Sequence, residues 1–362
     1  MYGERIQKLQ AKLPELKLTA ILIENQFNLQ YLTGFDGLQG DGRLLVTPTA
    51  ATLITDARYE EDLHETLETG ISLTITRNYF AVIKAIVDTK KITRLGFEDT
   101  LIYQDYALLQ KLDNVSLQAT SQVVDTLRAQ KGPEELAATQ KAIELSGAGF
   151  DYLLTQIHAG MTELQVANCL DGWMKAHGAS GASFDTIVAS GARAAMPHGA
   201  ATTKILQSGE MITIDFGYYV DGYTSDITRT IALGDPDPKL KQIYAIVKKA
   251  QEKVIAAIHP GVSGKALDAV GRDFITAQGY GKKFNHGIGH GIGLDIHEYP
   301  QSYGAMPQFK VDENEILTVE PGIYVVGLGG VRIEDDVQVT PTGCMRLSQI
   351  TRDLIVLPDE KN

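Results

Sequence analysis

The sequence predicts an α/β N-terminal domain over residues 1–127 and an α+β C-terminal domain over residues 128–362 that contains a pseudo-two-fold internal repeat. Strand-like apolar runs alternate with amphipathic segments in the first part of the chain. A helix start at Gly132-Pro133 marks the boundary. Two later stretches are similar at a constant offset of 105 residues, ITIDFGYYV at 212–220 and LTVEPGIYV at 317–325.

The alternation in residues 1–127 is typical of a small α/β domain. The predicted strands cover residues 19–24, 43–46, 71–76 and 95–97. The predicted helices cover residues 60–67, 79–87 and 103–112. No pattern in this domain indicates a catalytic site.

The composition is that of an ordinary soluble globular protein, with 44% apolar and 22% charged residues. A net charge of −12 argues against nucleic acid or an anionic membrane as the main partner. The two cysteines cannot form a disulfide framework, so free thiols are expected. The N-terminus has no secretory signal pattern, and no apolar run approaches the roughly 18–20 residues that cross a bilayer. We therefore expect a cytoplasmic protein.

The repeat in the C-terminal domain includes helix ends. Residues 157–162 (IHAGMT) and 258–263 (IHPGVS) are similar at an offset of 101 residues. In each copy a glycine can end one helix and a Thr or Ser can cap the next. Gln165 follows Thr162 at the spacing of a capping box. We therefore expect two related halves, each with helices and an acid-bearing hairpin.

The first hairpin brings two aspartates to one face. The Asp-Gly pair at 221–222 predicts a two-residue type I′ turn. The register that follows pairs Asp215 with Thr228 and Gly217 with Asp226, and Gly217 is expected to leave room between the acids. The two aspartates are then diagonal neighbours at about 7–8 Å, and burying them requires a cation. The alternative is a solvent-exposed hairpin, which the apolar neighbours of Asp215 disfavour.

The second copy supplies Glu320, the counterpart of Asp215, and a second acid, Glu334. Two aspartates follow Glu334 directly, so spacing alone does not select it. The repeat favours Glu334, as does Arg332 on the same strand face, which can hold a carboxylate by a bidentate contact. The alternative is that residues 332–336 form an ordinary charged edge strand.

Histidines are concentrated near these acids, in the segments MPHG at 196–199, NHGIGHGIG at 285–293 and DIHE at 295–298. Alternating glycines let the backbone approach a site closely. A phosphate-binding loop is disfavoured because no Gly-Lys-Ser/Thr follows. The candidate site histidines are His198, His286, His290 and His297, with His259 as a further candidate.

Four carboxylates and one imidazole suit two divalent ions, whose charge balances the carboxylates. Oxygen-rich ligation with one histidine favours Mn²⁺, with Co²⁺ or Zn²⁺ as alternatives. Two metal ions about 3.5–4 Å apart lower the pKa of bound water and polarise the attacked carbonyl in many hydrolases. The pattern therefore predicts a dinuclear hydrolytic site.

At these residues the chain resembles the pita-bread metallopeptidases, and within them the branch of Xaa-Pro aminopeptidases and prolidases. An N-terminal segment, NLQYLTGFDG at 28–37, resembles the accessory domain of the same branch. The shared C-terminal segments are MPHG at 196–199, TIDFG at 213–217, SDITRT at 225–230, HGIGHGIG at 286–293, VEPGIY at 319–324 and VRIED at 331–335.

The resemblance implies a complete set of metal ligands, with no family position missing. Asp215 and Asp226 would hold one ion together, and Glu334 would bridge the two ions with one of these aspartates. The implied ligands are Asp215, Asp226, His290, Glu320 and Glu334.

The resemblance also implies the reaction. A metal-bridging hydroxide would attack the scissile carbonyl, and Glu320 would shuttle the proton to the leaving proline nitrogen. His297 would stabilise the oxyanion, and His198 is a further catalytic candidate. The implied substrate-binding residues are His198, His286, His297 and Arg332.

A proline in the second position explains why a dedicated enzyme is needed, because an Xaa-Pro bond has no N–H and a fixed φ. The segments at 28–37 and 178–191 favour an Xaa-Pro aminopeptidase acting on proline-containing peptides. The alternative is an Xaa-Pro dipeptidase (prolidase), restricted to dipeptides. A metal-free creatinase-like hydrolase or a non-catalytic binding homologue is a remote alternative. The resemblance alone leads us to expect a homodimer, in which the N-terminal domain closes a neighbour's site.

Overall fold

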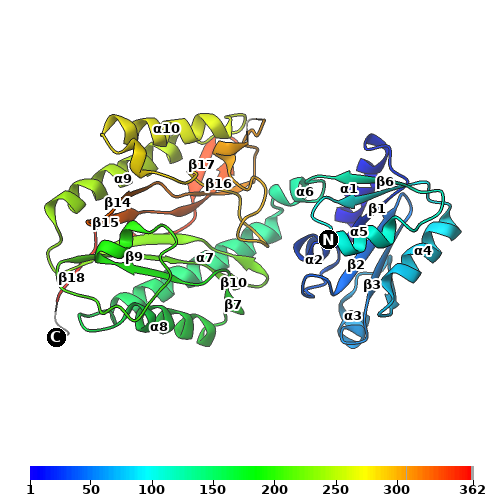
Figure 1. The fold of residues 1–362 in the computed structure, drawn as a ribbon, viewed down its shortest axis with the longest axis horizontal. Coiled ribbons are helices and arrows are strands. Elements are labelled where there is room, and N and C mark those ends of the chain that lie inside the picture. The colour runs from blue at the N-terminus through cyan, green and yellow to red at the C-terminus, as the bar shows by residue number, and fades with distance from the viewer. Residues whose placement is uncertain (307, 360–362) are drawn as a thin grey trace. The chain divides into compact units, whose positions relative to one another are not determined.

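The chain folds into two compact units, Met1–Arg128 and Ala129–Asn362, and each is described by itself. This computed structural model describes residues 1–306 and 308–359. Figure 1 shows the ribbon from the blue N-terminus to the red C-terminal strands. In the described residues, no helix combines the length and the apolar character needed to span a bilayer.

The N-terminal unit contains one mixed six-stranded sheet. Its strands are β1 (Ala20–Ile23), β2 (Gly42–Thr47), β3 (Ala50–Thr55), β4 (Ile71–Ile75), β5 (Arg94–Glu98) and β6 (Ser116–Thr120). They lie in the order β4-β3-β2-β1-β5-β6. β2 is antiparallel to both of its neighbours, whereas the remaining pairs are parallel. All four residues of β1 are buried, as expected for a strand covered on both faces.

Helices cover this sheet. They are α1 (Tyr2–Glu15), α2 (Gln26–Thr33), α3 (Glu60–Thr66), α4 (Tyr79–Lys90), α5 (Tyr103–Leu109) and α6 (Asp125–Ala129). α1 and α2 contact β2, and α4 contacts β3. Apolar residues of α4 and α5 share one buried cluster with residues of β1, β2, β3 and β5. The predicted α/β class of this unit is confirmed.

The predicted elements of this unit are all present, with ends within three residues of the predicted ones. The sequence did not predict α1, α2, β3, β6 or α6. Within the described residues β6 is an edge strand paired with β5, and its sequence, SLQAT, alternates but contains a single large apolar residue, so the signal is weak. α2 is defined mainly by its ends, where Asn25 accepts two backbone N–H groups and Gly34 adopts a left-handed conformation.

The C-terminal unit contains two helix pairs and a set of short strands. The helices are α7 (Pro133–Leu154), α8 (Glu163–Ala176), α9 (Pro238–Ala257) and α10 (Gly264–Ala277), with short 3₁₀ turns η1 (Gly191–Ala195), η2 (Gly281–Lys283) and η3 (Tyr303–Ala305). The strands of the first half are β7 (Gly181–Ala182), β8 (Ile187–Ser190), β9 (Glu210–Phe216), β10 (Tyr218–Val220), β11 (Tyr223–Thr224) and β12 (Ile227–Leu233). Those of the second half are β13 (Ile316–Val319), β14 (Gly322–Val325), β15 (Gly329–Arg332), β16 (Asp335–Thr340), β17 (Gly343–Arg346) and β18 (Val356–Leu357).

The predicted internal repeat is confirmed by the helix ends. Thr162 caps α8 through its hydroxyl, and Gln165 returns the bond to complete the capping box. Ser263 caps α10 in the same way. The preceding glycines, Gly160 and Gly261, both have a positive φ. Each half thus contains a helix, a glycine turn, a capped second helix and a hairpin region.

Each half has its own core, and the two halves meet at the strands. α7 and α8 pack with β9 and β12 in one apolar cluster, while α9 and α10 pack with β13 to β16 in another. The N–H of Glu334 donates to the carbonyl of Thr228 at 3.0 Å. The Thr230 hydroxyl bonds the backbone of Arg332. β12 of the first half therefore lies against residues 332–334 of the second, and this contact places the acidic residues between the halves.

Candidate metal centre

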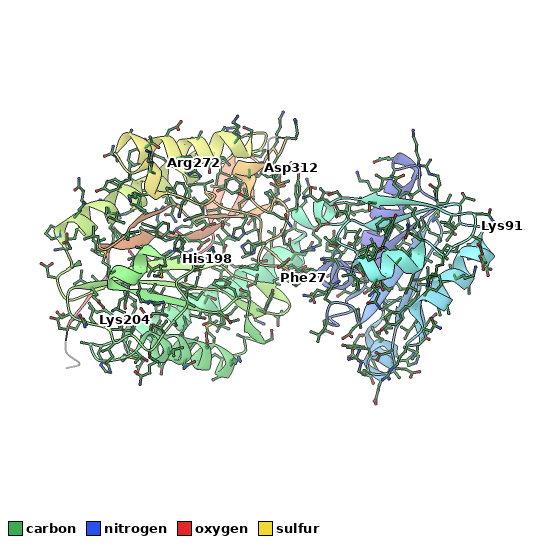
Figure 2. The ribbon with its side chains drawn as sticks, in the orientation of Figure 1. Phe27, Lys91, His198, Lys204, Arg272 and Asp312 are labelled. Carbon is green, nitrogen blue, oxygen red and sulfur yellow. The ribbon has the colours of Figure 1, made fainter. Side chains whose placement is uncertain are left out.

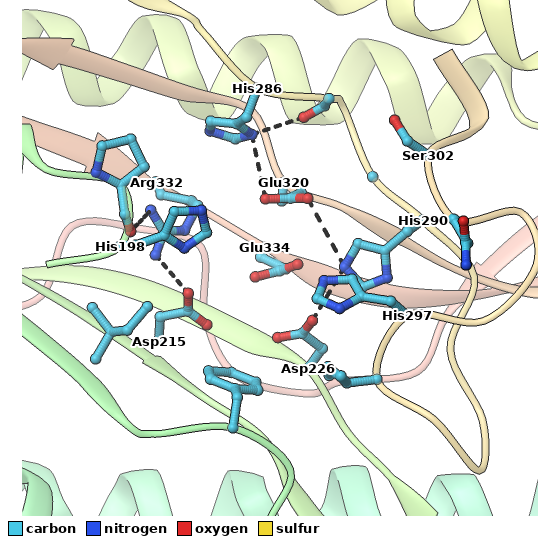
Figure 3. Close-up of a pocket in the computed structure, with 17 residues that line it drawn as sticks. His198, Asp215, Asp226, His286, His290, His297, Ser302, Glu320, Arg332 and Glu334 are labelled. Atoms are coloured by element: carbon cyan, nitrogen blue, oxygen red, sulfur yellow. Dashed lines mark hydrogen bonds and ion pairs between the residues drawn. The ribbon is translucent and has the colours of Figure 1, made fainter. Parts of the chain in front are cut away.

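The four candidate acids lie where strands are interrupted. Asp215 is the second-to-last residue of β9, just before the break at Gly217, and Asp226 lies between β11 and β12. In the second half, Glu320 lies between β13 and β14, and Glu334 lies between β15 and β16. Because both halves break their strands at equivalent places, the repeat brings all four acids to one region (Figure 3).

The predicted hairpin register is confirmed. Val220 pairs with Tyr223, and Asp215 pairs with Thr228. Both residues of the turn, Asp221 and Gly222, have a positive φ, as a type I′ turn requires.

Gly217 is required by its close neighbours. A Cβ at this position would lie 2.2 Å from the Ser225 carbonyl oxygen and 2.5 Å from the Ser183 hydroxyl. Any other residue here would therefore displace the backbone of Ser225 or the side chain of Ser183.

His290 is oriented by backbone contacts on both sides. Its carbonyl accepts the Thr318 N–H at 2.8 Å. Its Nδ1 lies 3.0 Å from the Gly291 carbonyl oxygen, so Nδ1 carries the proton and the lone pair of Nε2 is free. Nε2 lies 3.4 Å from Asp226 Oδ2 and 4.0 Å from Glu320 Oε1. An imidazole held in this way is the usual form of a metal-ligating histidine.

Glycines on both sides of His290 allow this arrangement. A Cβ at Gly289 would lie 2.0 Å from the Thr318 carbonyl oxygen, and one at Gly291 would lie 2.5 Å from the Tyr299 carbonyl oxygen. The glycine run therefore serves close backbone approach, as its sequence suggests.

Three side chains come close enough to share one ion. Ligand atoms of Asp226, His290 and Glu334 all lie within 4.8 Å of one another, and all three residues are buried. Asp215 and Glu320 lie outside this three-residue group, although both line the same cavity. Asp215 Oδ1 is buried and has no hydrogen-bond partner within the described chain. Such an oxygen, facing a cluster of acids, fits a cation ligand.

Burial affects the proton affinity of these acids. Loss of water raises the pKa of Asp226 and of Glu334 well above their usual values, and the neighbouring carboxylates raise them further. Burial likewise raises the pKa of Glu320 to about 7. Without a cation these groups retain protons because their anionic forms repel one another in a dry site. Divalent ions relieve this cost, so the residues present fit the metal that the chemistry requires.

The two aspartates after Glu334 bond to the backbone and side chains around the site and do not line the cavity. Asp336 Oδ2 accepts the N–H of Asp226 at 3.0 Å, and burial raises the pKa of Asp336 to about 8. Asp335 is paired with Arg229 at 2.6 Å and is completely buried. The alternative of a charged edge strand over residues 332–336 is therefore wrong.

Arg332 contacts a different acid from the one expected. Its Nη2 lies 2.6 Å from Asp215 Oδ2, a single contact where a bidentate contact with a carboxylate was expected. The other N–H groups are used elsewhere: Nε donates to the Thr228 hydroxyl, and Nη1 donates to Tyr324 Oη and to the Pro197 carbonyl. With these three partners, only one guanidinium nitrogen remains for Asp215.

No sequence pattern indicates a role for Thr228 or Tyr324. The Thr228 hydroxyl donates to Glu334 Oε2 at 2.6 Å and accepts from Arg332. Tyr324 Oη accepts from Arg332 and donates to His286 Nε2, each at 2.8 Å. The repeat matches Tyr324 with Tyr219, but only the structure shows that Tyr324 lies in this network.

The candidate histidines have different surroundings. His286 is held by Tyr324 and by the Gly287 carbonyl, and burial lowers its pKa to about 4. Burial also lowers the pKa of His297 to about 4, and its ring lies 4.5 Å from that of His290. Both are therefore neutral at neutral pH. His259 is exposed and lies outside the cavity lining.

These side chains surround a cavity of about 300 Å³ (Figure 3). His198 lies on its rim, and Figure 2 places it in the C-terminal unit. One part of the wall is apolar and the rest is polar or charged. The apolar lining residues are Phe184, Ile187, Pro197 and Ile296, and the polar ones are His198, Asp215, Asp226, His286, His290, His297, Gln301, Ser302, Glu320, Arg332 and Glu334.

Comparison with known proteins agrees with this geometry. Residues 137–341 match metallopeptidase family M24, and residues 5–130 match the creatinase/prolidase N-terminal domain. The chain belongs to metallopeptidase family M24. M24 enzymes use divalent metal ions, and the acid and histidine cluster described above is the part of this chain suited to hold them.

Full-length relatives refine the M24 assignment. The chain is 36% identical to the Xaa-Pro dipeptidase of Pyrococcus horikoshii, over 98% of this chain and 99% of the relative. The structure of an Xaa-Pro dipeptidase from Bacillus anthracis matches with a TM-score of 0.93 and 39% identity, covering 99% of this chain and 100% of the other. The X-Pro aminopeptidase structure from Thermotoga maritima matches with a TM-score of 0.88 and 35% identity, covering 97% and 99%. The predicted pita-bread fold and Xaa-Pro peptidase branch are confirmed.

Metal binding should stabilise the fold more at neutral than at acidic pH. In the folded, metal-free chain the pKa of the buried carboxyls is raised. These carboxyls therefore keep protons at a pH at which the same groups of the unfolded chain have lost theirs. Glu320 has an ordinary pKa of about 4.5 in the unfolded chain and a pKa of about 7 in the folded chain. As the pH rises through this range, the unfolded state loses its proton first, so folding stability falls. We expect the thermal midpoint of metal-free protein to fall over this range, and added Mn²⁺ to raise it more above pH 7 than near pH 5. A larger Mn²⁺ effect at the acidic pH would contradict this.

The Thr228→Val variant tests whether the Thr228 hydroxyl helps to hold Glu334 and Arg332 in place for metal binding. Valine has the same shape but leaves Glu334 Oε2 and the Arg332 Nε–H without a partner. We expect the affinity for Mn²⁺ to fall roughly 10- to 100-fold, measured by calorimetric titration. Thr213→Val is the matched control, since the one partner of this buried hydroxyl among the described residues is Thr230 in the same sheet. Equal affinity in the Thr228→Val and Thr213→Val proteins would refute the role of Thr228.

Proposed function

We propose that this chain is a metal-dependent Xaa-Pro dipeptidase that hydrolyses the bond between an N-terminal residue and proline. The observation that carries the proposal is the buried group of carboxylates around His290 in the wall of the cavity. The names of the relatives favour dipeptidase over the aminopeptidase activity that the sequence suggested first. In this proposal residues 128–362 are the catalytic domain and residues 1–127 the accessory domain.

Two divalent ions are proposed, held by Asp215, Asp226, His290, Glu320 and Glu334. Four carboxylates balance the charge of two such ions, and ligation by oxygen with one imidazole favours Mn²⁺ over softer choices, with Co²⁺ or Zn²⁺ as alternatives. When bound, the ions would lower the pKa of a water molecule and polarise the scissile carbonyl. We keep a homodimer and a cytoplasmic location as parts of the proposal.

The side chains around the ions have distinct proposed tasks. Glu320, beside the proposed ions, can accept a proton from the attacking water and deliver it to the proline nitrogen. His297 is neutral at neutral pH and can donate a ring N–H to the scissile carbonyl oxygen as negative charge develops on it. His198 and His286 line the substrate side of the cavity. Arg332, fixed by Tyr324 and Thr228, keeps Asp215 in place.

The cavity suits a small substrate with an apolar ring. Its volume of about 300 Å³ is at the small end of the range for ligand sites. Phe184, Ile187, Pro197 and Ile296 provide an apolar wall against which a proline ring can pack. These features support a dipeptide substrate, whereas the match to the Thermotoga maritima X-Pro aminopeptidase keeps longer peptides as the second candidate.

Hydrolysis of Leu-Pro and of Leu-Pro-Gly-Gly distinguishes the two candidates. We expect kcat/KM for the dipeptide to exceed that for the tetrapeptide by at least about tenfold, because a small cavity has little room for chain beyond proline. Leu-Gly, which lacks proline, is the control and should be a poor substrate. Both activities should disappear with a chelator and return with Mn²⁺. Equal kcat/KM for both proline peptides would instead identify an aminopeptidase.

A further inference from the structure

The loop that carries His297 is held by the residue that follows it. The Glu298 side chain is only 2% exposed. Its Oε1 accepts the N–H of Leu294 at 2.7 Å and that of Asp295 at 3.1 Å. Its own N–H donates to the Gly291 carbonyl at 3.0 Å. One carboxylate therefore fixes the backbone on both sides of the loop.

A glycine in the loop makes this contact possible. A Cβ at Gly293 would lie 2.7–2.9 Å from the three atoms of the Glu298 carboxylate. The N–H of Gly291 donates to the Pro300 carbonyl at 2.8 Å, which closes the loop at its base. The segment from Gly291 to Pro300 is thus a closed loop with a carboxylate at its centre.

The charge at the centre of this loop is balanced by a lysine from a distant part of the chain. Lys131 Nζ lies 3.1 Å from Glu298 Oε2, and its side chain is 1% exposed. Its backbone N–H donates to the Asn314 carbonyl at 3.1 Å, so the lysine is fixed at both ends. Lys131 also lowers the pKa of Glu315, a pKa that burial raises to about 7. A substitution of Lys131 therefore also affects Glu315. A substitution of Glu298 as well is needed to attribute an effect to the Lys131–Glu298 ion pair.

His297 depends on this loop for its position. Within residues 1–306 and 308–359 its ring has no hydrogen-bond partner, and its ring contact is with His290, at 4.5 Å between centroids. A ring without a hydrogen bond takes its position from its backbone. That backbone is the one that Glu298 holds.

We propose that Lys131 and Glu298 form a positioning pair that holds His297 against the metal centre. The inference rests on the proposed function, because His297 acts there on the substrate oxygen. Neither residue touches the cavity, so both act through the His297 loop. A buried carboxylate that loses its cationic partner must become protonated or draw in water, and either change releases the loop.

A double-mutant cycle tests this pair. We expect Lys131→Met to lower kcat on Leu-Pro roughly 10- to 100-fold at saturating metal, since misplacement by about 1 Å has effects of this size. KM and Mn²⁺ affinity should change little. In a His297→Ala background, Lys131→Met should have no further effect, because the residue through which it acts is gone. Lys131→Arg should recover most of the rate.

Two further variants complete the test. Glu298→Gln keeps an oxygen for the two loop N–H groups but removes the charge, and it replaces Lys131→Met if that protein does not fold. Lys141→Met is the control, because Lys141 forms an exposed ion pair with Asp221 on the same unit, at 2.6 Å. Its kcat should equal that of the wild type.

The outcomes separate this inference from the proposed function. If the wild type hydrolyses Leu-Pro but the losses from Lys131→Met and His297→Ala multiply, or kcat is unchanged, the positioning pair is refuted and the function stands. If the wild type hydrolyses no proline peptide, the proposed function fails. The ring ¹H–¹⁵N signals of His297 in metal-free protein then decide: a shift in Lys131→Met supports the pair, and an unchanged signal overturns it.

Discussion

The structure of the C-terminal unit depends on the burial of several carboxylates that face one another. Asp226 and Glu334 are almost completely buried, and burial raises the pKa of both. Nearby carboxylates raise these pKa values further, Asp215 that of Asp226 and Asp226 that of Glu334. A fold that brings such groups together is unfavourable unless a cation compensates their charge. Many surrounding features follow from this constraint, including the Arg332 contact to Asp215 and the hydrogen bonds from Thr228.

The internal repeat explains how the acids meet. In each half the strands are broken at equivalent places, and the acids lie at or next to these breaks. The halves are unequal in chemistry, because only the second follows the His-Gly run that contains His290. The first half contributes Asp215, Asp226 and β12, against which the second half lies. A duplicated scaffold thus supplies a symmetric set of carboxylates and a single imidazole on one side.

Local sequence predicted the parts of this site that follow from local rules. The Asp-Gly turn set the register of Asp215 and Asp226, and the paired Thr162 and Ser263 caps showed the repeat. The sequence could not show which partner a charged group would find across the fold. The sequence predicts a bidentate contact between Arg332 and a carboxylate. In the structure Arg332 makes a single contact with Asp215, because Thr228 and Tyr324 accept from its other N–H groups. The link between Lys131 and Glu298 joins residues that no local pattern relates.

The metal content of the purified protein tests the central claim most directly. After dialysis against Mn²⁺ and removal of free metal, elemental analysis should find two ions per wild-type chain. The Asp226→Ala protein should hold fewer, because it loses a ligand from the group with His290 and Glu334. Less than one ion per wild-type chain, with no effect of a chelator on folding stability, would contradict the account that a cation compensates the buried acids.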